Sequence, residues 1–124
     1  MGEPRSTDRS SQARGRWGED LAERHYRRLG YELLDRNWRP DGGPQRGELD
    51  LVLRHGHTVV FCEVKARRTA AYGGAALAVD RRKQLRVRRL AAAWLAAHDV
   101  RCAEIRFDVV AITGVELVLL EAAF

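Results

Sequence analysis

The chain has few cysteines and no long apolar run, and each shortage excludes a class of protein. Its two cysteines, Cys62 and Cys102, do not form a metal-ligand or redox spacing, and we interpret both as ordinary thiols. No apolar stretch approaches the roughly 20 residues that a membrane-spanning helix requires. Residues 1–13 are polar and lack the apolar core of a signal peptide. We therefore expect a cytoplasmic protein with no membrane partner.

Lysine is scarce in a chain that is nonetheless basic. Of the 22 Lys and Arg residues only Lys65 and Lys83 are lysine, and the net charge is +5. Arginine binds phosphate well, and a basic balance fits a nucleic-acid partner. Because the same bias also follows from GC-rich coding, composition alone does not establish that partner.

The length of 124 residues fits one domain. Residues 1–13 are rich in Ser, Arg and Gly and have no periodicity, so we expect a disordered tail followed by a single domain over residues 14–124. Hydrophobic periodicity predicts the order α-β-β-β-α-β-β. The expected elements are a helix over 15–29, a strand over 31–38, a hairpin over 47–65, a helix over 79–98 that Asp80 caps, and strands over 105–112 and 115–120.

The hairpin carries the most informative residues of the chain. A two-residue turn at His55-Gly56 would place Asp50 opposite Phe61, and Glu48 opposite Glu63. Side chains alternate along a strand, so the hairpin has a charged face and an apolar face. The charged face would hold Glu48, Asp50, Glu63 and Lys65, and the apolar face Leu49, Leu51, Val60, Cys62 and Val64.

Grouped carboxylates on a sheet face predict a divalent metal site. Glu48, Asp50 and Glu63 would repel one another, and a cation relieves that repulsion. Asp50 and Glu63 would each supply an oxygen and the carbonyl of Val64 a third, which suits Mg²⁺ or Mn²⁺ together with a substrate phosphate. Such a metal polarises a phosphoryl group and lowers the pKa of a water molecule. Lys65 would orient that water or stabilise charge on the phosphate. The alternative is a solvent-exposed surface pair of Glu63 and Lys65.

Several blocks, in order along the chain, resemble the bacterial YraN family. They are Arg14-Gly15-x-x-Gly18-Glu19, Arg36-Asn37-Trp38-Arg39, the runs 47–52 and 61–67, Lys83, and Arg106-Phe107-Asp108-Val109-Val110. The resemblance covers residues 14–124. That family is similar to restriction-endonuclease-like nucleases and archaeal Holliday-junction resolvases. The resemblance therefore implies an α/β fold with a restriction-endonuclease-like core, in which helices flank a mixed sheet of about five strands.

The resemblance also implies roles for individual residues. The motif of those nucleases is Pro-Asp, a spacer, then Asp or Glu, any residue, and Lys. Asp50 and Glu63 match its metal ligands, and Lys65 matches its catalytic lysine. Glu19 matches a helix glutamate that resolvase-like members add to the metal site. Leu49 stands where the motif has proline, a position at which the wider motif often departs.

The other charged candidates each keep a second interpretation. Glu48 is an extra ligand or general base, or else a neighbour that tunes Asp50. Lys83 is a phosphate contact, which its match to a family position favours, or a chain that lies along apolar surface with its charge in solvent. The arginines near the hairpin and on the second helix could follow a phosphate backbone or form a solvated face. They include Arg67, Arg68, Arg82 and Arg86.

Three hypotheses about function follow. The first is a metal-dependent nuclease that hydrolyses DNA phosphodiesters, with branched DNA as one candidate substrate. The second is a nucleic-acid-binding module of the same fold with little or no turnover. The third is a non-catalytic interaction protein in which the charged residues only pair with one another. The complete set of carboxylates and lysine favours the first. Coordinated cleavage of two strands would require a homodimer, because each chain offers one site.

Overall fold

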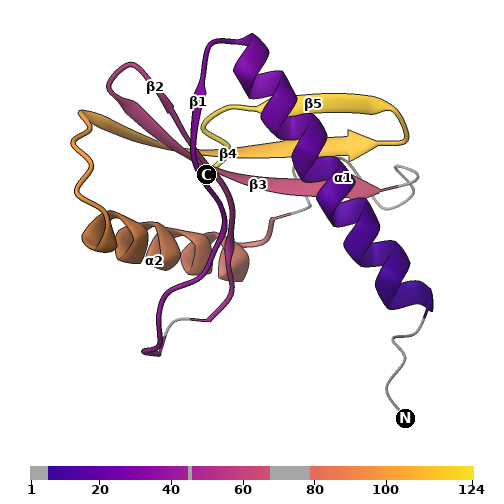
Figure 1. Ribbon diagram of the computed structural model, residues 1–124, viewed down its shortest axis with the longest axis horizontal. Helices are drawn as coiled ribbons and strands as arrows, with labels where there is room; N and C mark the ends of the chain where they lie inside the picture. Colours follow the sequence, from indigo (N-terminus) through magenta and orange to yellow (C-terminus); the bar gives the residue numbers. More distant parts are fainter. Residues whose placement is uncertain (1–5, 45, 68–78) are drawn as a thin grey trace.

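One mixed sheet organises the chain (Figure 1). The computed structural model describes residues 6–44, 46–67 and 79–124. The strands lie in the order β1-β2-β3-β4-β5, in which β3 and β4 are parallel and the other neighbours are antiparallel. The elements are α1 (Ser6–Arg28), β1 (Glu32–Trp38), β2 (Leu49–His55), β3 (Thr58–Arg67), α2 (Arg81–Ala97), β4 (Glu104–Thr113) and β5 (Glu116–Leu120). The predicted element order and the α/β fold class are confirmed.

The two helices pack on opposite faces of this sheet. Ala22 and Tyr26 of α1 lie in a buried cluster that the strands complete with Leu51, Leu53, Val60, Cys62, Val110 and Ile112. The other cluster joins Val87, Leu90, Ala91 and Trp94 of α2 to Leu49, Val52, Val59, Phe61 and Phe107. The alternation of side chains along β2 and β3 thus supplies one core to each helix. Among the described residues, no helix is long and apolar enough to span a bilayer.

The first helix begins earlier than the sequence pattern predicts. It starts at Ser6 rather than near Gly15, so residues 6–13, which we expected in a disordered tail, are helical. Residues 1–5 lie outside the described part of the chain. The first turns of α1 lack apolar periodicity, which is why the pattern missed them. No proline interrupts residues 6–28, and Ala13 and Arg14 are strong helix formers.

The hairpin turns at Gly56-His57 and not at His55-Gly56. His55 pairs with Thr58, and Leu51 pairs with Cys62. Gly56 has a φ of +60° and takes the first turn position, where two-residue hairpin turns favour glycine. The expected pairs of Asp50 with Phe61 and of Glu48 with Glu63 were therefore wrong. The register differs by two residues, so each side chain of the paired segment keeps its predicted face.

The start of β2 breaks the alternation. Leu49 packs in the α2 cluster, although we expected it on the face of Leu51. The pairing of β2 with β3 ends at Leu51 and Cys62. Beyond that pair the peptide N–H of Val64 donates to Oδ2 of Asp50, at 2.9 Å. The two strands therefore meet here through a side chain, while Leu49 keeps its pairing with Trp38 of β1.

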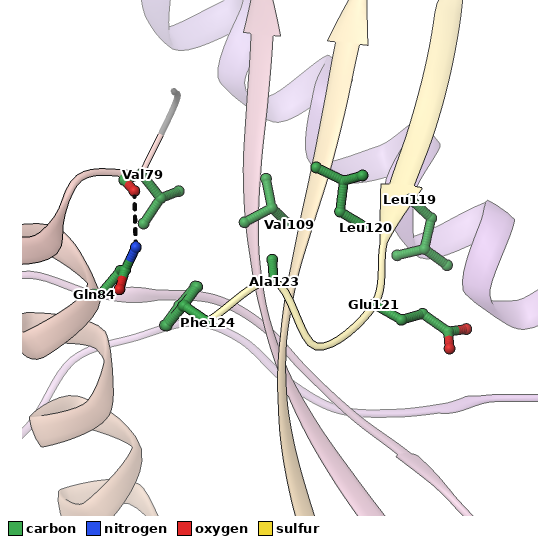
Figure 2. Close-up of a pocket in the computed structure, with 8 residues that line it drawn as sticks. All are labelled: Val79, Gln84, Val109, Leu119, Leu120, Glu121, Ala123 and Phe124. Carbon is green, nitrogen blue, oxygen red and sulfur yellow. Dashed lines mark hydrogen bonds between the residues drawn. The ribbon is translucent and has the colours of Figure 1, made fainter. Parts of the chain in front are cut away.

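An apolar cavity of about 380 Å³ lies between the start of α2 and the end of the chain (Figure 2). Its lining residues are Val79, Gln84, Val109, Leu119, Leu120, Glu121, Ala123 and Phe124. Glu121 is the one titratable side chain among them, and Gln84 is held by a hydrogen bond of 3.2 Å to the carbonyl of Val79. This cavity gathers no catalytic set of side chains, so the functional site is sought elsewhere.

Candidate active site

A second and smaller cavity lies where β2, β3 and the first turns of α2 meet. Its volume is about 240 Å³. Asp50 comes from β2, Glu63 from β3 and Lys83 from α2, which Asp80 caps through a hydrogen bond of 2.9 Å from the peptide N–H of Lys83. The lining residues are Gly47, Glu48, Asp50, Glu63, Lys83, Arg86, Val87 and Leu90. The structure thus brings the predicted carboxylates together beside basic side chains of the second helix.

Glu63 is the most buried carboxylate of this cavity, with 3% of its surface exposed. Its Oε1 lies 3.5 Å from Nζ of Lys83. Its Oε2 is buried and has no hydrogen-bond partner among the described residues. Burial raises the pKa of Glu63, and the charge of Lys83 opposes that rise. A buried carboxylate oxygen without a partner is costly unless a cation binds it. The interpretation of Glu63 as a solvent-exposed surface residue is therefore wrong.

Asp50 lies beside Glu63 and is also largely shielded from solvent. Burial, and after it the charge of neighbouring Glu63, raises the pKa of Asp50 from 3.8 to about 8, although the hydrogen bond from the peptide N–H of Val64 opposes that rise. Two neighbouring carboxylates in a poorly solvated site cannot both ionise cheaply. A cation between them would remove that penalty.

Lys65 and Lys83 lie together at the other side of Glu63. The neighbouring positive charge of Lys83, together with burial, lowers the pKa of Lys65 from 10.5 to about 8. No ion pair joins Lys65 to Glu63 in the part of the chain that the structure describes, where the partner of Glu63 is Lys83. Lys65 is thus half-buried, with a pKa that lies closer to neutral pH than that of an ordinary lysine.

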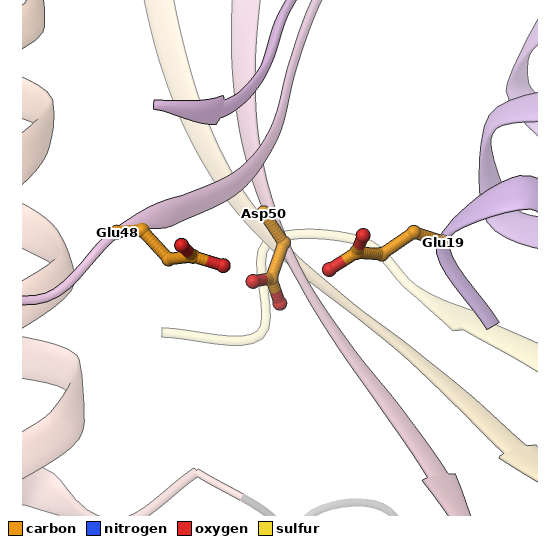
Figure 3. Close-up of side chains that lie close together, drawn as sticks. All are labelled: Glu19, Glu48 and Asp50. Carbon is orange, nitrogen blue, oxygen red and sulfur yellow. The ribbon is translucent and has the colours of Figure 1, made fainter. Parts of the chain in front are cut away.

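Two further carboxylates flank Asp50, with Glu48 on one side and Glu19 on the other (Figure 3). Oxygens of Glu19, Glu48 and Asp50 all lie within 4.8 Å of one another. Glu19 reaches the group from α1, and Glu48 immediately precedes β2. Glu19 is 8% exposed. The structure therefore joins the helix glutamate, which only the resemblance suggested, to the residues of the hairpin.

Side chains of β1 hold these two glutamates, and sequence reasoning missed that role. Asn37 donates from Nδ2 to Oε2 of Glu19 at 3.0 Å and to Oε1 of Glu48 at 3.2 Å. Arg39 donates to the other oxygen of Glu48 at 2.9 Å, and Arg36 lies 3.4 Å from the other oxygen of Glu19. The available signal was the block Arg36-Asn37-Trp38-Arg39, whose partners lie far away in the sequence.

The predicted basic residues do not all reach the cavity. Lys83 lines it, whereas Arg67 and Arg82 are exposed. Arg68 lies outside the described residues. Arg86, which the sequence singled out only as one of several helix arginines, also lines the cavity. A Cβ at Gly47, whose φ is +98°, would lie 3.3 Å from Cδ of Arg86, so glycine leaves room for that side chain.

The residues present fit a hard divalent cation. Oxygens of Glu19, Glu48 and Asp50 lie within 4.8 Å of one another, and Glu63 lines the same cavity as Glu48 and Asp50. Carboxylate oxygens of this kind suit Mg²⁺ and Mn²⁺. Oε2 of Glu63 is buried and has no partner among the described residues, so a bound cation would offset the cost of burying it. The carbonyl of Val64 as a further ligand stays a prediction.

The fold and the cluster together define an α/β protein whose mixed sheet carries a carboxylate and lysine site at one end. A model of a family described as "Uncharacterised protein family UPF0102" matches residues 18–112. The chain belongs to this family, and the predicted membership of the YraN family is confirmed.

Several relatives share this sequence over most of its length. The chain is 51% identical over 105 residues to a UPF0102 protein of Frankia casuarinae, covering 85% of this chain and 86% of the relative. It is 53% identical over 104 residues to one of Parafrankia, covering 84% and 85%. It is 49% identical over 96 residues to one of Geobacter sulfurreducens, covering 77% and 72%. Because the family is described as uncharacterised, membership shows common ancestry but assigns no activity. An activity has to be inferred from the residues of the site.

Proposed function

We propose that this chain is a metal-dependent nuclease that hydrolyses DNA phosphodiesters. The observation that carries the proposal is the buried Oε2 of Glu63, which has no partner among the described residues and lies in a cavity with Asp50 and Lys83. A site built only for stability would satisfy that oxygen, since buried polar groups in native proteins are almost always hydrogen-bonded.

The proposed division of labour gives the carboxylates and the basic residues different tasks. Asp50 and Glu63, with the carbonyl of Val64 and with Glu19, would hold Mg²⁺ or Mn²⁺. When bound, the cation would act as a Lewis acid on the scissile phosphate. Its charge would also compensate the two carboxylates whose pKa values burial raises.

Lys65 is the proposed general base. Its pKa of about 8 lies close to neutral pH, where proton transfer by a positioned side chain is most effective. Water attacks phosphorus, Lys65 accepts the proton that the water loses, and the phosphorus–oxygen bond to the leaving strand breaks. Lys83 and Arg86 line the same cavity and would bind the non-bridging oxygens of the phosphate.

Cleavage assays on defined DNA substrates test the proposal. The full chain would be incubated with Mg²⁺ or Mn²⁺ and with plasmid, single-stranded, flap or four-way-junction DNA. We expect cleavage of at least one substrate, which EDTA and Asp50→Ala both abolish. Arg27→Gln is the matched control, because it removes an exposed ion pair between neighbours on α1. No cleavage of any substrate, with wild type and Asp50→Ala indistinguishable, would overturn the nuclease proposal.

A nucleic-acid-binding module with little turnover is the second candidate. The exposed arginines of α2 favour it, since they need only a phosphate backbone as partner. They are Arg81, Arg82, Arg86, Arg88 and Arg89. Affinity for DNA that falls steeply with salt, in the absence of cleavage, would support this candidate over the first.

A further inference from the structure

We infer that Asn37 is a positioning residue, whose side-chain amide holds Glu19 and Glu48 beside Asp50 in the orientation that serves a bound divalent cation. The inference rests on the metal site of the proposed function, and its test separates the two. Asn37 belongs to β1, whereas Glu19 belongs to α1 and Glu48 precedes β2. One side chain therefore links three segments around the cluster.

The hydrogen bonds of Asn37 use both amide hydrogens on carboxylates. One bond reaches Oε2 of Glu19 at 3.0 Å, and the other reaches Oε1 of Glu48 at 3.2 Å. The donor is neutral, so it orients the two carboxylates without cancelling their charges. An ammonium or guanidinium group at the same place would compete with a cation for them. Arg36 and Arg39 contact only the other oxygen of each carboxylate.

The backbone at Asn37 restricts which residues can take this place. Its φ is +53°, in the left-handed region that side chains other than Asn and Asp seldom adopt. Glycine would adopt that conformation easily but has no amide to donate. Aspartate would add a third negative charge between Glu19 and Glu48. Asparagine alone combines tolerance of this backbone with two neutral donors.

The attachment of α1 to the sheet does not depend on Asn37. Arg36 bonds to α1 at 2.7 Å to Asp20, 3.2 Å to Glu23 and 3.2 Å to the carbonyl of Arg16. The buried Ala22 and Tyr26 of α1 also pack against the strands. Asn37 is exposed and belongs to neither apolar cluster. Removal of its amide should therefore change the cluster and leave the fold intact.

Binding of Mn²⁺ to the full chain, followed by electron paramagnetic resonance of the free ion, tests the inference without any substrate. We expect Asn37→Gly to weaken Mn²⁺ binding about 10-fold, which is the usual cost of losing a group that orients metal ligands, with the unfolding temperature unchanged. Ala122→Gly is the matched control, because Ala122 is the other non-glycine residue in the described ranges with a positive φ, of 49°. It should leave Mn²⁺ binding at the wild-type level.

A double variant that lacks both carboxylates tests whether Asn37 affects Mn²⁺ binding through Glu19 and Glu48 or in some other way. In the Glu19→Gln, Glu48→Gln double variant, the further change Asn37→Gly should no longer alter Mn²⁺ affinity. If Asn37→Gly does not fold, Asn37→Ser replaces it, since serine is too short to reach both carboxylates, and the same loss is expected.

The outcomes distinguish the inference from the proposal beneath it. Absence of Mn²⁺ binding by the wild type would overturn the proposed metal site itself. Wild-type binding with unchanged affinity in Asn37→Gly would overturn the role of Asn37 alone. A lowered unfolding temperature with unchanged Mn²⁺ affinity would also overturn it, because Asn37 would then be only structural.

Discussion

Asp108 and Glu63 are buried carboxylates on opposite faces of the same sheet, and they differ in how many hydrogen-bond partners surround them. Asp108 is 0% exposed and accepts four hydrogen bonds. They come from Tyr26 at 2.8 Å, Nε and Nη2 of Arg106 at 2.8 and 2.9 Å, and the peptide N–H of Ala122 at 3.0 Å. Glu63 is 3% exposed, has Lys83 at 3.5 Å, and leaves one oxygen without a partner.

The difference in hydrogen-bond partners indicates that Asp108 is a structural carboxylate, whereas Glu63 belongs to the candidate site. The donors around Asp108 offset the cost of burying it, and its hydrogen bond raises the pKa of Arg106. Nothing in the described residues does the same for Oε2 of Glu63. A buried carboxylate whose oxygens all accept hydrogen bonds stabilises the fold. A buried carboxylate with an unpartnered oxygen destabilises the fold until a cation binds that oxygen.

The largest expected effect is on the structural side of this comparison. Asp108→Ala should lower the free energy of unfolding by about 3–5 kcal/mol, because it takes the shared acceptor from the buried Tyr26 hydroxyl, the peptide N–H of Ala122 and the half-buried Arg106 guanidinium. Urea denaturation would measure the loss. The folded fraction should keep its Mn²⁺ affinity, since Asp108 is not among the residues that line the candidate site. A loss below about 1 kcal/mol would contradict the structural role.

The next largest effect is expected on the rate of DNA cleavage when Lys65 of the candidate site is replaced. Lys65→Ala should lower kcat for DNA cleavage about 10²–10³-fold, as the loss of a group that acts on the reacting atoms does, with Mn²⁺ affinity unchanged. Arg67→Ala, two residues along β3 and exposed, serves as the control. It should raise KM and leave kcat at the wild-type value. Equal kcat in Lys65→Ala and wild type would rule out Lys65 as the base.

Glu63→Gln tests whether Glu63, unlike Asp108, contributes to metal binding. Mn²⁺ at 100 times its dissociation constant should stabilise the wild type by about 2.7 kcal/mol, and calorimetry should detect no such shift in Glu63→Gln. Without metal, the variant should be at least as stable as the wild type, because a neutral amide is cheaper to bury than a carboxylate with one oxygen unpartnered. A large destabilisation of metal-free Glu63→Gln would place Glu63 in the same class as Asp108.

The smallest effect concerns pH. The pKa of Asp50 is raised from 3.8 to about 8 by burial and then by Glu63, so between these values the folded state retains a proton that the unfolded chain has lost. The free energy of unfolding of the metal-free protein should therefore fall as pH rises from about 4 to about 8. Asp50→Asn should reduce that slope to the part that the raised pKa of Glu63 contributes, and the variant should be more stable than the wild type at pH 8. An equal slope in variant and wild type would contradict the burial of Asp50.

The sequence predicted the fold class and the faces of the hairpin, even though one detail was wrong. The turn was assigned to His55-Gly56, and the structure places it at Gly56-His57. Because side chains repeat every two residues along a strand, a register error of two leaves Asp50 and Glu63 on the predicted face. A periodic pattern thus predicts which face a residue takes better than which residue it faces.

The rest of the site depends on contacts that no local pattern contains. The bonds from Asn37 to Glu19 and Glu48 join residues from separate segments, and the left-handed backbone of Asn37 left no signature in an apolar periodicity. Leu49 lies in the α2 cluster, where β2 no longer pairs with β3 and Asp50 accepts a hydrogen bond from Val64 instead. Such features follow from tertiary packing, which overrides the intrinsic preferences of a strand.

The parallel pairing of β3 with β4 has a consequence for how the protein assembles. The strands β1, β2 and β3 form a meander of neighbours in sequence, so they can pair after short loops close. Thr58, in contrast, pairs with Glu104, and loop-closure entropy makes such a distant contact slow to form. Lys83 and Arg86 lie on the helix inside that long connection. We therefore expect a newly made chain to bring Asp50 and Glu63 together early and Lys83 and Arg86 to them late, so that the candidate site is complete only when the last strands have docked.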